Sequence, residues 1–88
     1  MSRELVLPPD YSVYAWEIKD KGVLDTYVLV DDLPVSVSFF DPVRLQQEIA
    51  HDLEQGRHFT VKRLLVVERV TLQNMQLAVS EAPPEFFD

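Results

Sequence analysis

Two neighbouring stretches in the first third of the chain are mostly apolar. Residues 11–19 (YSVYAWEIK) and 23–30 (VLDTYVLV) are rich in aromatic and β-branched residues, which are typical of strands. Residues 20–22 lie between them and end in Gly22, a residue that favours a tight turn. The pattern therefore predicts a β-hairpin.

A third strand-like stretch follows a second turn, and in this one apolar and polar residues alternate. Residues 35–39 place Val35, Val37 and Phe39 on one face and two serines on the other, which is the period of a half-buried strand. The turn before it, residues 31–34, holds two aspartates and a proline. The first three strands are expected to form an antiparallel meander.

The spacing of apolar residues then changes from two to four, which predicts a helix with one buried stripe. The residues of this stripe are Leu45, Ile49 and Leu53. Asp41 can accept a hydrogen bond from the free backbone N–H groups of the first turn, and Pro42 has no N–H to leave unpaired. A helix is expected over residues 41–55.

The last third of the chain predicts one more strand and one ambiguous element. Residues 58–70 alternate and then become continuously apolar, as expected of a long fourth strand inside the sheet. Residues 71–82 fit the spacing of both a strand and a helix. Helix is favoured, because Thr71 can cap its start and Pro83 would end it, with a fifth strand as the alternative.

These elements together predict the α+β class. A single domain is expected over residues 1–82, with an antiparallel three-stranded meander, a helix, a fourth strand and a short helix or fifth strand. Residues 83–88 (PPEFFD) are expected to form an acidic aromatic C-terminal tail.

The composition of the chain argues against several classes of site and partner. The chain of 88 residues has no cysteine and a net charge of −7, which argues against disulfides, thiolate metal sites and nucleic acid as a partner. Its two glycines leave none for a phosphate-binding loop. The N-terminal apolar run is too short for a signal peptide or a membrane span, so no membrane partner and a cytoplasmic location are expected.

Glu48 and His51 have the Glu-x-x-His spacing that helices of di-iron bundles use to bind metal. At 100° per residue, His51 lies about 240° around the helix from Leu45 and so points away from the apolar stripe. The chain also offers no second copy of this spacing. We therefore expect no catalytic residue, no metal ligand and no cofactor.

Apolar side chains remain on the sheet after helices have covered one of its faces. Monomers seldom leave such a face open, so self-association or coverage by the aromatic tail is expected. The predicted interaction residues are Tyr14, Trp16, Leu64, Val66, Phe86 and Phe87.

The sequence therefore favours a small, acidic, non-enzymatic protein-interaction domain. It is expected to self-associate and to be able to bind a basic protein, since opposite charges steer association. The alternative is a small-molecule-binding domain or small enzyme with an aromatic-lined pocket near Trp16.

Overall fold

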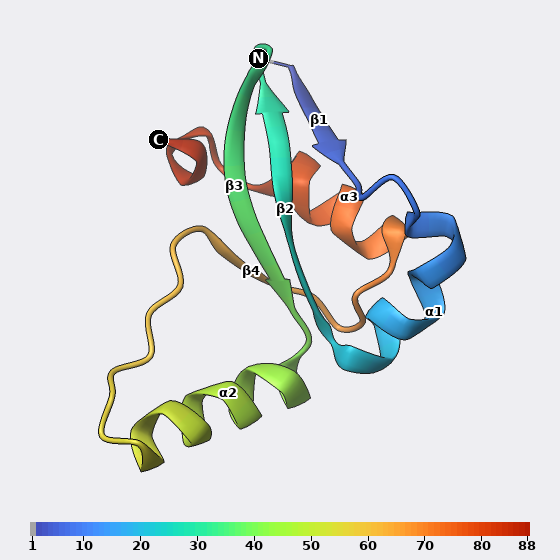
Figure 1. Cartoon of the computed structure of the whole chain (residues 1–88). Coiled ribbons are helices and arrows are strands. Elements are labelled where there is room, and N and C mark those ends of the chain that lie inside the picture. Colours follow the sequence, from blue (N-terminus) through green and yellow to red (C-terminus); the bar gives the residue numbers. More distant parts are fainter. Residues whose placement is uncertain (1) are drawn as a thin grey trace.

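The protein builds a four-stranded mixed sheet with helices interleaved along the chain, as the computed structural model of residues 2–88 shows (Figure 1). The strands are β1 (Arg3–Val6), β2 (Val23–Val30), β3 (Leu33–Phe40) and β4 (Leu64–Val66), in the spatial order β1-β2-β3-β4. The helices are α1 (Tyr11–Lys21), α2 (Pro42–Glu54), α3 (Leu72–Glu81) and the 3-10 helix η1 (Pro84–Phe87). The predicted α+β class is confirmed.

The long hairpin of β2 and β3 is the centre of the sheet. The two strands are antiparallel and pair along their whole length, from Val23 opposite Phe40 to Val30 opposite Leu33. The turn between them places Asp31 and Asp32 at φ 50° and 69°, which suits the right-handed twist of a two-residue hairpin. The prediction of a strand at residues 35–39 is confirmed.

The prediction of a strand over residues 11–19 is wrong, because this stretch forms α1. Tyr11 and Ile18, seven residues apart on one face of the helix, pack against the core. Gly22 is not part of a hairpin turn: at φ 74° it ends α1, and its N–H donates to the carbonyl of Ile18. The strand that pairs with β2 is instead β1.

The predicted long fourth strand is also wrong in length and place. Only Leu64–Val66 is paired, in parallel with the last residues of β3, and β4 is an edge strand. Arg63, at φ 56°, interrupts the extended backbone just before it. A left-handed residue turns the chain, so the preceding residues cannot continue the ladder.

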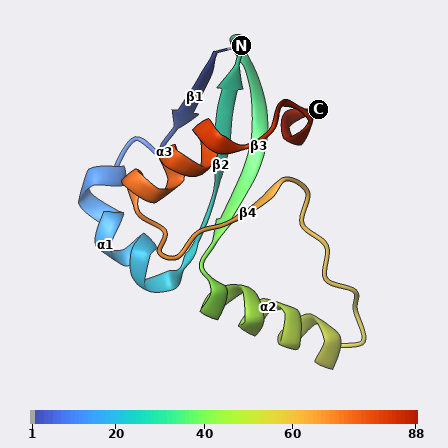
Figure 2. The same cartoon turned by 180° about the vertical axis from the view of Figure 1, so that it is seen from behind.

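The core lies on one face of the sheet. It joins Val28, Val37 and Phe39 of the hairpin to Met75 and Val79 of α3, all of them buried. Figure 2 shows α1 and α3 on the same side of the sheet. The favoured helix at residues 71–82 is thus confirmed as α3.

The helix predicted at residues 41–55 is confirmed as α2, with Asp41 accepting a hydrogen bond from the N–H of Arg44 at 2.7 Å. Its apolar stripe, however, is not buried. None of the residues of α2 is buried, and Leu53 is 61% exposed. Figure 1 shows α2 extending away from one end of the sheet.

The C-terminal residues fold back onto the body. Phe87 is 7% exposed and belongs to the core, and the Phe86 ring meets it edge to face with centroids 5.1 Å apart. Arg63 Nη2 donates to the main-chain oxygen of Asp88 at 2.9 Å. Residues 83–88 are therefore a packed segment.

Candidate functional site

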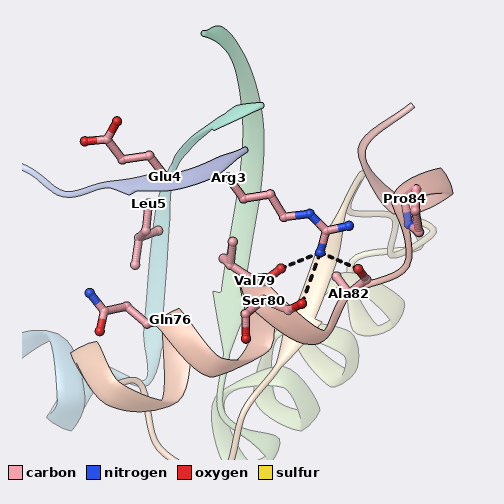
Figure 3. A pocket seen from close by; sticks show the side chains of 8 residues that line it. All are labelled: Arg3, Glu4, Leu5, Gln76, Val79, Ser80, Ala82 and Pro84. Carbon is pink, nitrogen blue, oxygen red and sulfur yellow. Dashed lines mark hydrogen bonds between the residues drawn. The ribbon is translucent and has the colours of Figure 1, made fainter. Parts of the chain in front are cut away.

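Two surfaces are candidates for a site. The first is a groove between β1 and α3, with a volume of about 770 Å³ (Figure 3). Its lining residues are Arg3, Glu4, Leu5, Gln76, Val79, Ser80, Ala82 and Pro84. This volume lies within the range of roughly 300–1,000 Å³ that is typical of small-molecule sites.

Arg3 dominates the groove, but its guanidinium is already engaged. Nη1 lies 2.8 Å from the carbonyl oxygen of Val79 and 3.3 Å from that of Ser80, and it also donates to the carbonyl of Ala82. The guanidinium carbon lies 4.8 Å from the centre of the Phe87 ring. Figure 3 shows the side chain reaching from β1 to the end of α3.

This engagement has a structural cause. The last turn of α3 contains no basic residue, although the free carbonyls at the end of a helix favour a positive charge. Arg3 of β1 supplies that charge, although it lies 76 residues before Val79 in the sequence. Glu4 is the other charged residue of the lining, and a single exposed carboxylate is not an acid–base pair.

The titratable side chains of α2 and α1 either make contacts within the fold or are exposed. Glu48 is bonded to Arg44, with Nη2 and Oε1 2.8 Å apart. His51 is exposed, as the helical spacing predicted. Burial raises the pKa of Tyr11 above its ordinary value of 10.0, and a hydrogen bond with the backbone of Leu72 partly offsets this. Across residues 2–88, no three His, Cys, Asp or Glu side chains gather closely enough to hold a metal ion.

The second candidate surface is the face of the sheet opposite the core, which we call the open face. Tyr27 of β2 is 53% exposed there and lies opposite Val6 and Ser36. A shallow depression of about 260 Å³ adjoins Tyr27. Its lining residues are Asp25, Thr26, Tyr27, Ser36, Val37 and Ser38.

Residues 42–63, which we call the α2 arm, connect β3 to β4, and α2 extends away from one end of the sheet (Figure 1). The arm is held at both ends. At its start, the N–H of Asp41 donates to the carbonyl of Gly22 at 2.9 Å. Near its other end, Phe59 packs edge to face on Phe40, with ring centroids 6.4 Å apart. The arm therefore has a defined position although its apolar stripe is uncovered.

Four of the predicted interaction residues lie on two different elements, two on α1 and two on β4. Tyr14 and Trp16 are 50% and 67% exposed, but they lie on α1 rather than on a strand. Leu64 and Val66 lie on β4, and their pairing with Ser38 and Phe40 places them on the open face. The structure does not bring these two pairs together into one surface.

The remaining two predicted residues, Phe86 and Phe87, lie in η1. Phe87 is buried and Phe86 is partly buried against the core. Sequence reasoning missed the exposure of Leu53 and Tyr27. The four-residue spacing did identify Leu53, but spacing gives only the direction of a side chain and not the surface that covers it.

Comparisons with protein-family models, curated proteins and solved structures found no match. None of the helices in residues 2–88 has the length and apolar composition that crossing a membrane requires. The groove, the open face and the α2 arm are therefore the features of the molecule that bear on its function.

Proposed function

We propose that the chain is a small, acidic, non-enzymatic protein-interaction domain that binds protein through the α2 arm and the open face. The observation that carries the proposal is the uncovered apolar stripe of α2. Helices of 13 residues, the length of α2, are marginal in water on their own and gain most of their stability from packing of one apolar face. A helix with this pattern whose apolar stripe is not buried by its own chain is suited to a partner.

The size of the uncovered stripe supports this proposal. Leu53 is 61% exposed, and Leu45 and Ile49 are only partly buried. Complete burial of one leucine contributes about 1.5–3 kcal/mol. Covering the stripe would therefore provide several kcal/mol toward binding.

The charge of the chain supports the proposal of a basic protein as a possible partner. Outside residues 42–63 the chain has four Lys or Arg and twelve Asp or Glu. A surface of this sign attracts basic proteins and speeds their association. The groove between β1 and α3 supports catalysis less, because Arg3 is engaged in capping α3.

Affinity capture with three forms of the tagged chain tests the proposed function. The forms are wild type, Leu53→Glu and the control Leu77→Glu, which alters a leucine of α3 that is 55% exposed. Wild type and Leu77→Glu are expected to recover the same protein, and Leu53→Glu is expected to lose it. Equal recovery by Leu53→Glu, or no recovery by wild type, would contradict the proposal.

A further inference from the structure

We propose that the occupant of both surfaces is a second copy of this chain, with the α2 arm of each copy lying on the open face of the other. This inference rests on the proposed function and assigns its partner. Four observations support it: the surface area of the chain, the path of the β3-α2-β4 connection, the charge of the arm and the shape of the open face.

The accessible surface is larger than a monomer of this mass should have. It measures 6005 Å², whereas the scaling relation for folded monomers gives about 5,300 Å² for 10.2 kDa. The excess of about 700 Å² is close to the roughly 800 Å² that each partner buries in a stable protein pair. The radius of gyration, 13.4 Å, likewise exceeds the roughly 12 Å expected for 88 residues.

The helix in the connection from β3 to β4 does not pack on the sheet in the way that such helices ordinarily do. β3 and β4 are parallel neighbours joined through α2, and a helix that joins two parallel strands ordinarily packs on a face of their sheet. α1 and α3 occupy the core face. The open face is thus the surface on which a helix from another copy can pack.

The junction between β3 and α2 explains why α2 does not fold onto its own sheet. Asp41 is bonded to Gly22 through its N–H and caps α2 through its side chain. Its carboxylate lies so close to Gly22 that a Cβ there would stand 2.6 Å from Asp41 Cγ. Turning α2 back would break these contacts, whereas docking on a second copy leaves them in place.

Charge favours a second copy at this position despite the net charge of −7. Residues 42–63 hold four Lys or Arg and three Asp or Glu, so the arm is slightly basic. Residues 57–63 hold three Lys or Arg and no acidic residue. Glu4 and Asp25 lie on the open face. Of the three basic residues, Arg57 pairs with Asp52 and Arg63 donates to the main-chain oxygen of Asp88, so Lys62 is the charge best placed to meet Glu4 or Asp25 of the other copy.

The open face also offers a place for an apolar side chain. A depression of about 260 Å³ lies beside Tyr27; Val6 of β1 is paired with Tyr27, and Leu29 is two residues from Tyr27 on the same face of β2. An arm and a face that match each other form a twofold symmetric pair, in which each contact occurs twice. This symmetry makes the inference sharply testable.

Analytical ultracentrifugation of the full chain, from about 1 to 200 μM, tests the inference with two matched pairs of variants. Leu53→Glu alters the arm, with Leu77→Glu as its control; these leucines are 61% and 55% exposed. Tyr27→Glu alters the open face, with Tyr14→Glu as its control; these tyrosines are 53% and 50% exposed. Circular dichroism melts establish that each variant folds.

Wild type and both controls are expected to dimerise with the same dissociation constant within about twofold. Leu53→Glu and Tyr27→Glu are each expected to raise it at least about tenfold, the effect of 1.4 kcal/mol. A mixture of these two variants is expected to form a heterodimer, because the intact arm of Tyr27→Glu meets the intact face of Leu53→Glu. Rescue in the mixture also shows that both variants are folded.

Several outcomes would overturn the inference. These are a wild type that stays monomeric, a dimer that Tyr27→Glu leaves intact, a dimer lost in Tyr14→Glu, and a mixture that stays monomeric. A monomeric wild type that still captures a different protein through Leu53 would overturn only this inference and leave the proposed function standing. Failure of both experiments would reject the two together.

Discussion

Removing the guanidinium of Arg3 tests how β1 and α3 are held together. Arg3→Met keeps an unbranched apolar side chain but removes the charge and the hydrogen bonds of Nη1 to the carbonyls of Val79, Ser80 and Ala82. It also removes the cation that lies 4.8 Å from the centre of the Phe87 ring. The substitution therefore affects the helix end and the C-terminal segment at once.

The expected loss follows from the separate contributions. A hydrogen bond to a charged group is worth about 1.5–3 kcal/mol, a cation at a helix C-terminus about 0.3–1 kcal/mol, and a cation over an aromatic ring about 0.5–1 kcal/mol. Because Arg3 is partly exposed and these effects overlap, we expect Arg3→Met to lower the free energy of unfolding by about 2–3 kcal/mol.

Urea unfolding monitored by circular dichroism measures this change, with Arg69→Met as the control. Arg69 is exposed, so its substitution is expected to cost less than about 0.5 kcal/mol. The melting temperature of Arg3→Met should fall by roughly 8–24 °C, since each kcal/mol shifts a domain of this size by about 4–8 °C. A loss no larger than that of Arg69→Met would refute the role assigned to Arg3.

Two further predictions concern the glycines that follow α1 and α2 and the phenol of Tyr11 in α1. Gly22→Ala and Gly56→Ala both place alanine at a left-handed φ, 74° and 73°, at a cost of roughly 1–2 kcal/mol each in the free energy of unfolding. In urea unfolding, Gly22→Ala is expected to cost about 1 kcal/mol more than Gly56→Ala. The reason is that a Cβ at Gly22 displaces the Asp41 cap, whereas Gly56 has open space around it. Equal losses would contradict this. The raised pKa of Tyr11 contributes stability that is fully present below pH 10 and is lost as the pH rises through the folded pKa. Tyr11→Phe is therefore expected to reduce the fall in the free energy of unfolding above pH 10, measured by urea unfolding at a series of pH values. An unchanged slope would contradict this assignment.

The sequence correctly predicted the elements whose boundaries depend on residues close to one another along the chain. The alternation of Val35, Val37 and Phe39 gave the face that packs on the core, because the side chains of a strand alternate between two faces. The pair Asp41-Pro42 gave the start of α2, because capping involves only residues of the first turn. The outward direction of His51 followed from helical geometry alone.

Residues 11–19 show where local signals compete. Their β-branched and aromatic side chains favour a strand, yet Lys19, Lys21 and Gly22 form a typical helix end. The structure resolves the conflict in favour of α1, since Tyr11 and Ile18 then reach the core. Weighting the helix end above residue propensity would have predicted α1.

The sequence by itself determined the α+β class, the β2-β3 hairpin, the start of α2 and the outward direction of His51, because these depend on contacts between residues close along the chain. Only the tertiary structure decided that Arg3 caps α3, that Phe87 is core, and that Leu53 stays exposed. The physical reason is that periodicity gives the direction in which a side chain points, whereas burial depends on which distant segment arrives to cover it.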